Sequence, residues 1–410
     1  MDQEHCRRLD AADPLAGCRA AFELPPGVIY LDGNSLGPLS KSARRRLDLA
    51  LGQEWAQGLI LGWTESGWLE APQRVGDRIG SLIGAAPGQV VVSDNTTVNL
   101  YKLASPALTL RPDRSTLLIQ DDDFPTDRFV AAGLAAASGG RVQVRYFKPD
   151  DMAGSLDAGT ALVILSQVDY RTGRLHDMPG ITRTIHDAGA LVLWDLSHSA
   201  GAVPVALDSS DVDLAAGCTY KFLNGGPGSP AYCYVAQRLQ SQVRSPIWSW
   251  LGHADPFAFG PSYEPGLGPK TFITGTPGIL GLAALEGALE AWRGVDLALL
   301  RQKSLDLADT FIALVKARCA GAGLDLLTPR ERDRRGSQVS WRHPRAQQII
   351  AELIRRGVIG DFRPPDICRF GLTPLYLGFE DVWHAVDQLG TVLESFAAGE
   401  PTTAVVPATP

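Results

Sequence analysis

Short hydrophobic runs alternate with helical patterns between about residue 87 and residue 235. Continuous runs of Val, Leu and Ile, bounded by turn-forming residues, are typical of strands that are buried on both faces of a parallel sheet. The predicted strands are QVVVS, STLLIQ, VQVRYF, ALVILS, ALVLWD, DLAAGC and AYCYVA, and the helices between them include TTVNLYKLASPAL and TDRFVAAGLAAAS. The pattern therefore predicts an α/β fold with a mostly parallel, doubly wound sheet.

The pattern changes toward the C-terminus, where one or two long helices are predicted from residue 278 to residue 317. They lead into a smaller C-terminal α+β domain, residues 285–396, with helices at AQQIIAELIRRG and EDVWHAVDQLGTVLESFA. Residues 51–284 would form the large domain. Residues 397–410 are rich in Pro and Thr and are predicted to be a disordered tail.

Composition and charge exclude several classes of protein. The 410 residues are 45% hydrophobic and 20% charged, and the 38 basic and 45 acidic side chains give a net charge of −7. No broad basic patch indicates nucleic-acid binding. The six cysteines are scattered without a C-x-x-C motif, so neither a disulfide framework nor a metal site is expected. The N-terminus lacks the hydrophobic stretch of a signal peptide, and every hydrophobic run is too short to span a bilayer. A cytoplasmic protein is expected.

The segment YLDGNSLGPLS contains Gly33 to Gly37 in the G-x-S-x-G pattern of a hydrolase nucleophile elbow. That motif follows a central strand, after several other strands have formed. Here the preceding run, VIYL, comes before every other predicted strand, and Pro38 follows directly. Ser35 is therefore not expected to be a nucleophile, and the glycines are expected to form a turn or to let the backbone approach a neighbour closely.

Polar residues follow the predicted strands, where ligands bind in open α/β sheets. Asp195 follows one strand, and Lys221 lies shortly after another. This pair suits pyridoxal phosphate, which needs a lysine for a Schiff base and a carboxylate that keeps its ring nitrogen protonated. Thr96 and Thr97 could bind the phosphate at a helix start. Phe124 could stack on the ring.

Each of these residues also has a simpler interpretation. Lys221 could be a solvated lysine at a strand end, Asp195 a helix cap, Phe124 a core side chain and His198 a structural histidine. The glycine-rich loop FLNGGPGSP, which lets the backbone come close to a ligand, follows Lys221 directly. The occurrence of all these residues together with the glycine-rich loop favours a pyridoxal phosphate site.

Six segments resemble the kynureninases, which are fold-type I pyridoxal phosphate enzymes related to the class V aminotransferases. They are YLDGNSLGPLS, DDDFPTDRF, WDLSHSAGAVP, CTYKFLNGGPGSPAYCYV, WSWLGHADPFAF and FITGTPGILGLAAL. The likeness covers about residues 22 to 396. F-P-T-D together with Y-K-F-L-N-G-G-P-G is a specific pair, whereas the Asp/His/Lys layout is shared with cysteine desulfurases.

The resemblance implies a role for each matching position. Lys221, Asp195 and Tyr220 would be catalytic, with Lys221 as the Schiff-base lysine and Tyr220 as the proton shuttle. The cofactor would be held by Thr96, Thr97, Phe124, Asp127, Ser166, Asp195, His198, Tyr220 and Lys221, and by Trp250 and Thr276 from the partner subunit of a homodimer. The substrate would be held by Trp63, Ser35, Thr276 and Arg369, with Arg369 on its carboxylate. Residues 1–50 would contribute to the active site.

The implied reaction is the hydrolysis of L-kynurenine to anthranilate and L-alanine, a step of tryptophan degradation. Trp63 and Thr276 stand where a histidine and an asparagine accompany the 3-hydroxy substrate in the family, so 3-hydroxykynurenine should be the poorer substrate. Two alternatives differ in class. A cysteine desulfurase or lyase would need a reactive cysteine, with Cys319 and Cys368 as candidates, and a non-catalytic sensor would carry a basic DNA-binding domain, which the sequence lacks.

Overall fold

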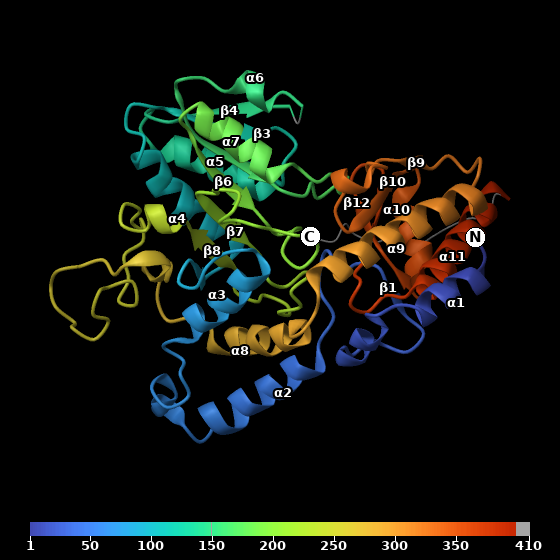
Figure 1. Cartoon of the computed structure of the whole chain (residues 1–410), viewed down its shortest axis with the longest axis horizontal. Helices are drawn as coiled ribbons and strands as arrows, with labels where there is room; N and C mark the ends of the chain where they lie inside the picture. Colours follow the sequence, from blue (N-terminus) through green and yellow to red (C-terminus); the bar gives the residue numbers. More distant parts are fainter. Residues whose placement is uncertain (149, 399–410) are drawn as a thin grey trace.

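The structure is a computed structural model that describes residues 1–148 and 150–398 (Figure 1). The predicted tail lies outside the described residues, except for its first two positions. The chain forms a large α/β body and a smaller body that contains both the N-terminal helix and the last helices of the described chain (Figure 1).

The large body is built on a seven-stranded sheet in the order β2-β8-β7-β6-β5-β3-β4. Neighbours from β7 through β4 are parallel, whereas β8 pairs antiparallel with both β7 and β2. The mostly parallel sheet of the prediction is therefore confirmed. The strands are β2 (Val90–Val92), β3 (Thr116–Gln120), β4 (Gln143–Phe147), β5 (Thr160–Ser166), β6 (Leu191–Asp195), β7 (Leu214–Gly217) and β8 (Tyr232–Val235).

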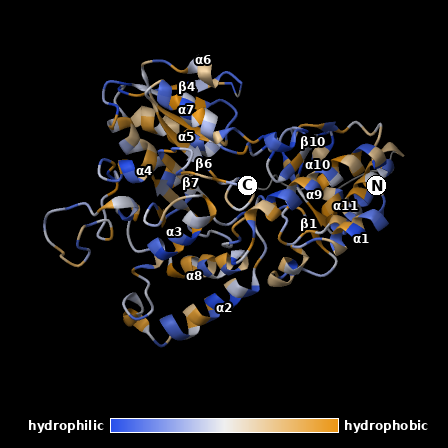
Figure 2. Cartoon of the chain, viewed as in Figure 1, coloured by the Kyte–Doolittle hydropathy of each residue, from blue (hydrophilic) through white to orange (hydrophobic). Residues whose placement is uncertain are grey.

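Helices cover both faces of this sheet because successive strand residues point to opposite faces. On β5, Ile164 packs in the hydrophobic cluster that contains α4 and α5, and Val163 packs in the one that contains α3, α7 and α8. The central strands and α8 are mostly hydrophobic (Figure 2). The helices are α2 (Lys41–Leu49), α3 (Ala71–Leu82), α4 (Thr96–Thr109), α5 (Pro125–Ala137), α6 (Met152–Ser155), α7 (Met178–Asp187) and α8 (Ile279–Ala288).

The smaller body has an antiparallel sheet in the order β12-β13-β10-β9, packed against helices. The long helical pattern of the sequence divides into two helices, α8 and α9, so the predicted boundary at residue 285 falls inside α8. The elements are α9 (Leu297–Arg318), β9 (Asp325–Leu326), β10 (Gln338–Arg342), α10 (Ala346–Arg355), β11 (Val358–Ile359), β12 (Asp361–Arg363), β13 (Ile367–Gly371) and α11 (Phe379–Ala397).

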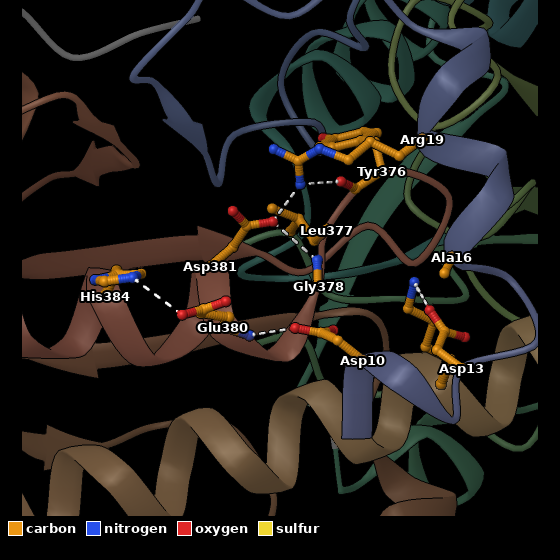
Figure 3. A pocket seen from close by; sticks show the side chains of 11 residues that line it. Asp10, Asp13, Ala16, Arg19, Tyr376, Leu377, Gly378, Glu380, Asp381 and His384 are labelled. Carbon is orange, nitrogen blue, oxygen red and sulfur yellow. Dashed lines mark hydrogen bonds and ion pairs between the residues drawn. The ribbon is translucent and has the colours of Figure 1, made fainter. Parts of the chain in front are cut away.

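The N-terminal segment joins the smaller body through α1 (Gln3–Ala11), which packs on α11, and β1 (Ile29–Tyr30), which pairs with β11. The Asp10 carboxylate accepts the backbone N–H groups of Phe379 and Glu380 at 2.7 and 2.9 Å, at the start of α11 (Figure 3). A cavity of about 410 Å³ lies beside this contact. In the wall of this cavity, Lys303 pairs with Asp13 and Arg19 pairs with Asp381. The hydrogen bonds to Asp10 join the chain's first helix to its last described one.

Candidate functional site

A cavity of about 150 Å³ lies at the carboxyl ends of β3, β5 and β6. Its position is where an open α/β sheet binds ligands. Most of the predicted site residues line it, although they come from distant parts of the sequence. The lining residues are Asn95, Thr96, Thr97, Phe124, Thr126, Asp127, Ser166, Tyr170, Asp195, Ser197, His198, Tyr220 and Lys221.

Lys221 and His198 are in contact inside this cavity. The Lys221 Nζ lies 2.9 Å from Nε2 of His198, and both residues are buried. Burial lowers the pKa of Lys221, and burial followed by the charge of Lys221 lowers the pKa of His198 well below its ordinary value. An uncharged amine is the form that attacks a carbonyl, so burial prepares Lys221 for covalent chemistry.

Three buried carboxylates lie in this region: Asp123 shortly after β3, Asp127 in the first turn of α5 and Asp195 at the end of β6. Asp195 accepts the N–H of Ser197 at 2.7 Å, and Asp123 accepts hydrogen bonds from the N–H and the hydroxyl of Ser166 at 2.9 and 2.6 Å. Neither carboxylate oxygen of Asp127 receives a hydrogen bond within the described residues. Burial raises the pKa of Asp127 and Asp195, and each affects the other. A ligand that brings an N–H⁺ group would compensate one negative charge of this pair.

The start of α4 supplies donors to the opposite part of the cavity. Asn95 caps this helix, because its side-chain oxygen accepts the N–H of Val98 at 3.1 Å. Thr96 and Thr97 form the first turn and line the cavity. Free N–H groups and hydroxyls at a helix N-terminus favour an anion such as a phosphate.

Two aromatic rings border the Lys221 amine. The Phe124 ring centroid lies 5.9 Å from Nζ, and the Tyr220 centroid lies 5.8 Å from it. Phe124 directly precedes α5, and its ring meets Tyr170 edge to face at 5.2 Å. Tyr170 is thereby part of the site. It was absent from the predicted residues, although its position shortly after β5 is a signal that could have found it.

The DGNSLG loop, residues 32–37, lies against the backbone of Tyr220 and Lys221. Gly37 donates its N–H to the carbonyl oxygen of Tyr220 at 2.7 Å. A Cβ on Gly37 would lie 2.2 Å from the carbonyl oxygen of Lys221, so this close approach needs glycine. The hydroxyl of Ser35 donates to Asp361 at 3.0 Å and accepts from Arg369 at 2.8 Å. These partners give Ser35 no base of the kind a nucleophile elbow uses.

All three guanidinium nitrogens of Arg369 hydrogen-bond to other groups of the protein. Its Nε donates to Asp361 at 2.8 Å, its Nη2 bonds the other oxygen of the same carboxylate, and its Nη1 donates to the Tyr170 carbonyl at 2.7 Å. Arg363 pairs with the same carboxylate at 2.7 Å. The bidentate partner of Arg369 in this structure is therefore Asp361. Asp361 and Arg363 were not among the predicted residues, because only folding brings β12 and β13 to this loop.

Three further predicted residues lie apart from the lysine cavity. Trp63 meets Trp250 edge to face, with ring centroids 6.0 Å apart. Trp250 lines a separate cavity of about 430 Å³ formed by residues 248–263. Thr276 lines another, which it shares with Asn95. The structure therefore brings Trp63 and Trp250 together, and it places Thr276 near the residue that caps α4.

The cavity residues fit pyridoxal phosphate. Lys221 offers an amine whose pKa burial lowers, the carboxylates of Asp195 and the unpartnered Asp127 suit a protonated ring nitrogen, and the start of α4 suits a phosphate. Within the described residues, the Nδ1 of His198 has no hydrogen-bond partner, which leaves it available to a polar ligand atom. Residues 1–148 and 150–398 include no helix with the length and hydrophobicity that a membrane span requires.

Solved structures with the same fold include two cysteine desulfurases. One, from Thermococcus onnurineus NA1, gives a TM-score of 0.77 at 18% identity and covers 94% of this chain and 98% of its own. The other, from Escherichia coli, gives 0.76 at 18% identity over 93% and 98%. A cystine C-S lyase complex with cysteine persulfide gives 0.73 at 17% identity, covering 89% and 98%. These identities support the fold-type I architecture alone.

Sequence comparisons are more specific. Residues 300–389 match the model of the kynureninase C-terminal domain. A kynureninase of Burkholderia pseudomallei is 46% identical over 400 residues, which cover 96% of each chain. A kynureninase of Pseudomonas fluorescens is 47% identical over 394 residues, or 95% of each chain. With identity at this level along nearly its whole length, the chain belongs to the kynureninase family.

Proposed function

We propose that this protein hydrolyses L-kynurenine to anthranilate and L-alanine, with pyridoxal phosphate as its cofactor. One observation carries the proposal: the buried amine of Lys221 meets His198 in a cavity that also contains the carboxylates of Asp195 and Asp127. Membership of the kynureninase family selects the reaction among those that such a cavity could support. The reaction adds one water across the Cβ–Cγ bond of the substrate.

Pyridoxal phosphate, when bound, supplies an electron sink at the amino acid's α carbon. Lys221 would hold the cofactor, and its amine would take the α proton of the substrate. Asp195 would accept the N–H of the ring, with Asp127 beside it. Thr96 and Thr97 would bind the phosphate. Together they fix the substrate's α carbon near the Lys221 amine.

Two further residues act on the substrate. The hydroxyl of Tyr220 is the candidate for moving protons at the γ-carbonyl, where water attacks. Its phenol stays protonated near neutral pH, because burial raises its pKa. Arg369 supplies the positive charge for the substrate's α-carboxylate, from a guanidinium that Asp361 holds in place.

A cysteine desulfurase or lyase is the alternative, and the thiols count against it. Cys368 is fully buried and Cys319 nearly so, and burial raises the pKa of both thiols, that of Cys319 to about 11. A thiol that attacks sulfur must reach the substrate as a thiolate. Neither candidate meets that requirement here. The free cysteines also suit a cytoplasmic location.

A homodimer would complete the site, with Trp250 and Thr276 reaching the partner's phosphate. Large hydrophobic side chains are exposed around Trp250, which is unusual for a surface that stays in water. They include Trp248, Phe257, Phe259 and Leu267, which are 68%, 53%, 79% and 81% exposed. Mixing Lys221→Ala with Thr276→Ala protein should restore about a quarter of the wild-type sites through mixed dimers. No recovery after subunit exchange would count against shared sites.

The test of the activity is direct. Purified protein loaded with pyridoxal phosphate should show a visible absorbance band that changes when L-kynurenine is added, while anthranilate fluorescence and L-alanine appear in equal amounts. L-cysteine should release no sulfide or persulfide. Sulfide release without anthranilate would favour the desulfurase.

A further inference from the structure

Asp361, Arg363 and Arg369 form a buried group of charges beside the DGNSLG loop, whose Ser35 bonds Asp361 and Arg369. Asp32 of the same loop is close enough for these charges to act on its carboxylate. The Asp361 carboxylate contacts both guanidiniums, as described above. Its side chain is 0% exposed, that of Arg369 is 1% exposed and that of Arg363 is 10% exposed. Water screens these charges poorly, so they must balance one another. We call these four residues the Arg–Asp cluster.

Asp32 is the less well supported of its two carboxylates. The residue is 6% exposed, and its Oδ1 is buried and receives no hydrogen bond within the described residues. The backbone carbonyl of Asp32 accepts the N–H groups of Ser35 and Leu36 at 2.9 and 3.1 Å, so the loop fixes its position. Asp361, in contrast, bonds the guanidinium of Arg369 through both carboxylate oxygens, and Arg363 pairs with one of them. A proton entering the cluster would therefore settle on Asp32.

The surroundings of Asp32 also favour its protonated form. Burial, and after it the charge of Asp361, raise the pKa of Asp32 to about 7, against the opposing effect of Arg369. Tyr30 on β1 and Tyr376 before α11 face it as neutral phenols, because burial raises the pKa of both. Asp32 is thus close to the balance between its two protonation states near neutral pH.

The charge balance changes when an amino acid binds. With both carboxylates ionised, the two guanidiniums of the empty cluster are neutralised. A substrate carboxylate would add a third negative charge to two positive ones in a site that excludes water. Burying an uncompensated charge is costly, and a group in that position takes up a proton instead.

We propose that Asp32 is the charge-compensating residue of the substrate-carboxylate site: above neutral pH it is ionised while the site is empty, and it takes up a proton when the carboxylate binds. The proposal rests on the proposed function, because the ligand is the amino acid of that reaction. It makes binding of the carboxylate depend on pH. Affinity is constant while Asp32 is already protonated, and it falls by about tenfold per pH unit once the empty site is ionised, above about pH 7.

The test uses the loaded enzyme and the product L-alanine as a competitive inhibitor, with L-alaninamide as a control that lacks the carboxylate. In wild type, the inhibition constant of L-alanine should rise above about pH 7 relative to that of L-alaninamide. Asp32→Asn should lose this additional rise and bind L-alanine about tenfold more tightly near pH 8. Asp48→Asn, at an exposed position on α2, should behave as wild type.

A direct proton count covers the case in which Asp32→Asn does not fold. A pH indicator in weak buffer should show, near pH 8, up to about one proton more per site taken up when wild type binds L-alanine than when it binds L-alaninamide. Equal proton counts, or parallel pH profiles in wild type and Asp32→Asn, would overturn the proposal. If wild type fails to cleave kynurenine, the proposed function falls instead, so the two failures are distinguishable.

Discussion

Gly37 donates its backbone N–H to the carbonyl oxygen of Tyr220 at 2.7 Å, which joins the N-terminal loop to the residue before Lys221. The same loop reaches Arg369 through Ser35 at 2.8 Å. One turn of six residues thus contacts both the lysine that would hold the cofactor and the arginine that would bind the substrate. A change in this loop can act on both binding steps without contributing a reacting atom.

Lys221→Ala should abolish turnover, by about 10³-fold or more, while the protein remains folded. The amine that takes the α proton is lost, and nothing at this position replaces it. Borohydride reduction of the loaded protein followed by peptide mapping should label Lys221. Lys102 is a suitable internal control, because it is also buried but paired with Asp94. A label on Lys102 or on any other lysine would refute the assignment.

Asp195→Asn should lower kcat by about 10²-fold or more. An amide cannot hold the ring nitrogen protonated, so the electron sink weakens, whereas the shape of the side chain is kept. Ser197→Ala provides the comparison, since it leaves the backbone N–H that caps Asp195. Activity of Asp195→Asn within threefold of wild type would show that this carboxylate only caps its turn.

Ser35→Ala should keep substantial activity. The substitution removes the hydrogen bonds of the hydroxyl with Asp361, Arg363 and Arg369, which should raise KM by about three- to tenfold and leave kcat nearly unchanged. Fluorophosphonates, which label nucleophilic serines, should not inactivate the wild-type enzyme. Stoichiometric labelling of Ser35 with loss of activity would restore the hydrolase interpretation.

L-kynurenine should be preferred over 3-hydroxykynurenine by about ten- to a hundredfold in kcat/KM. Indole offers one N–H and no acceptor, so a phenol pressed against Trp63 would lose water without a matching partner, at a cost of about 1–3 kcal/mol. Trp63 lies apart from the lysine cavity of its own chain and meets Trp250, so it would reach the substrate across the interface of the proposed homodimer.

The measurement is kcat/KM for both substrates in wild type and in the Trp63→His, Thr276→Asn double variant. The double variant should shift the preference toward the 3-hydroxy substrate, because the imidazole and the amide can both hydrogen-bond its phenol. Equal values in wild type, or an unchanged preference in the double variant, would rule out this role.

Asp10→Ala should lower the free energy of unfolding by about 1–2 kcal/mol, because the carboxylate caps two N–H groups at the start of α11. Thermal and denaturant unfolding of the loaded protein would measure the change. Asp10→Asn retains one acceptor oxygen and should lose less. Lys316→Ala, exposed on α9, is the control for a surface substitution. A loss as small as that of Lys316→Ala would show that α11 does not depend on this cap.

The sequence by itself determined the parallel sheet and the residues at its strand ends. Continuous hydrophobic runs such as ALVILS and ALVLW are typical of strands buried on both faces of a parallel sheet. Polar residues such as Asp195 directly after these runs therefore lie at one edge of the sheet. The F-P-T-D and Y-K-F-L-N-G-G-P-G motifs carried the family resemblance, because each is a local segment whose residues act together. Nine of the thirteen residues that line the lysine cavity were therefore named from the sequence, and the other four, Asn95, Thr126, Tyr170 and Ser197, were not among the predicted site residues.

Only the tertiary structure decided the Arg–Asp cluster. Asp32 and Asp361 are more than three hundred positions apart, and no periodicity links a loop near the N-terminus to β12 and β13. From the sequence, Arg369 was expected to pair with the carboxylate of the substrate. In the folded protein, its guanidinium pairs with Asp361. Charge balance in a buried site depends on every group within a few ångströms, and only folding sets those distances.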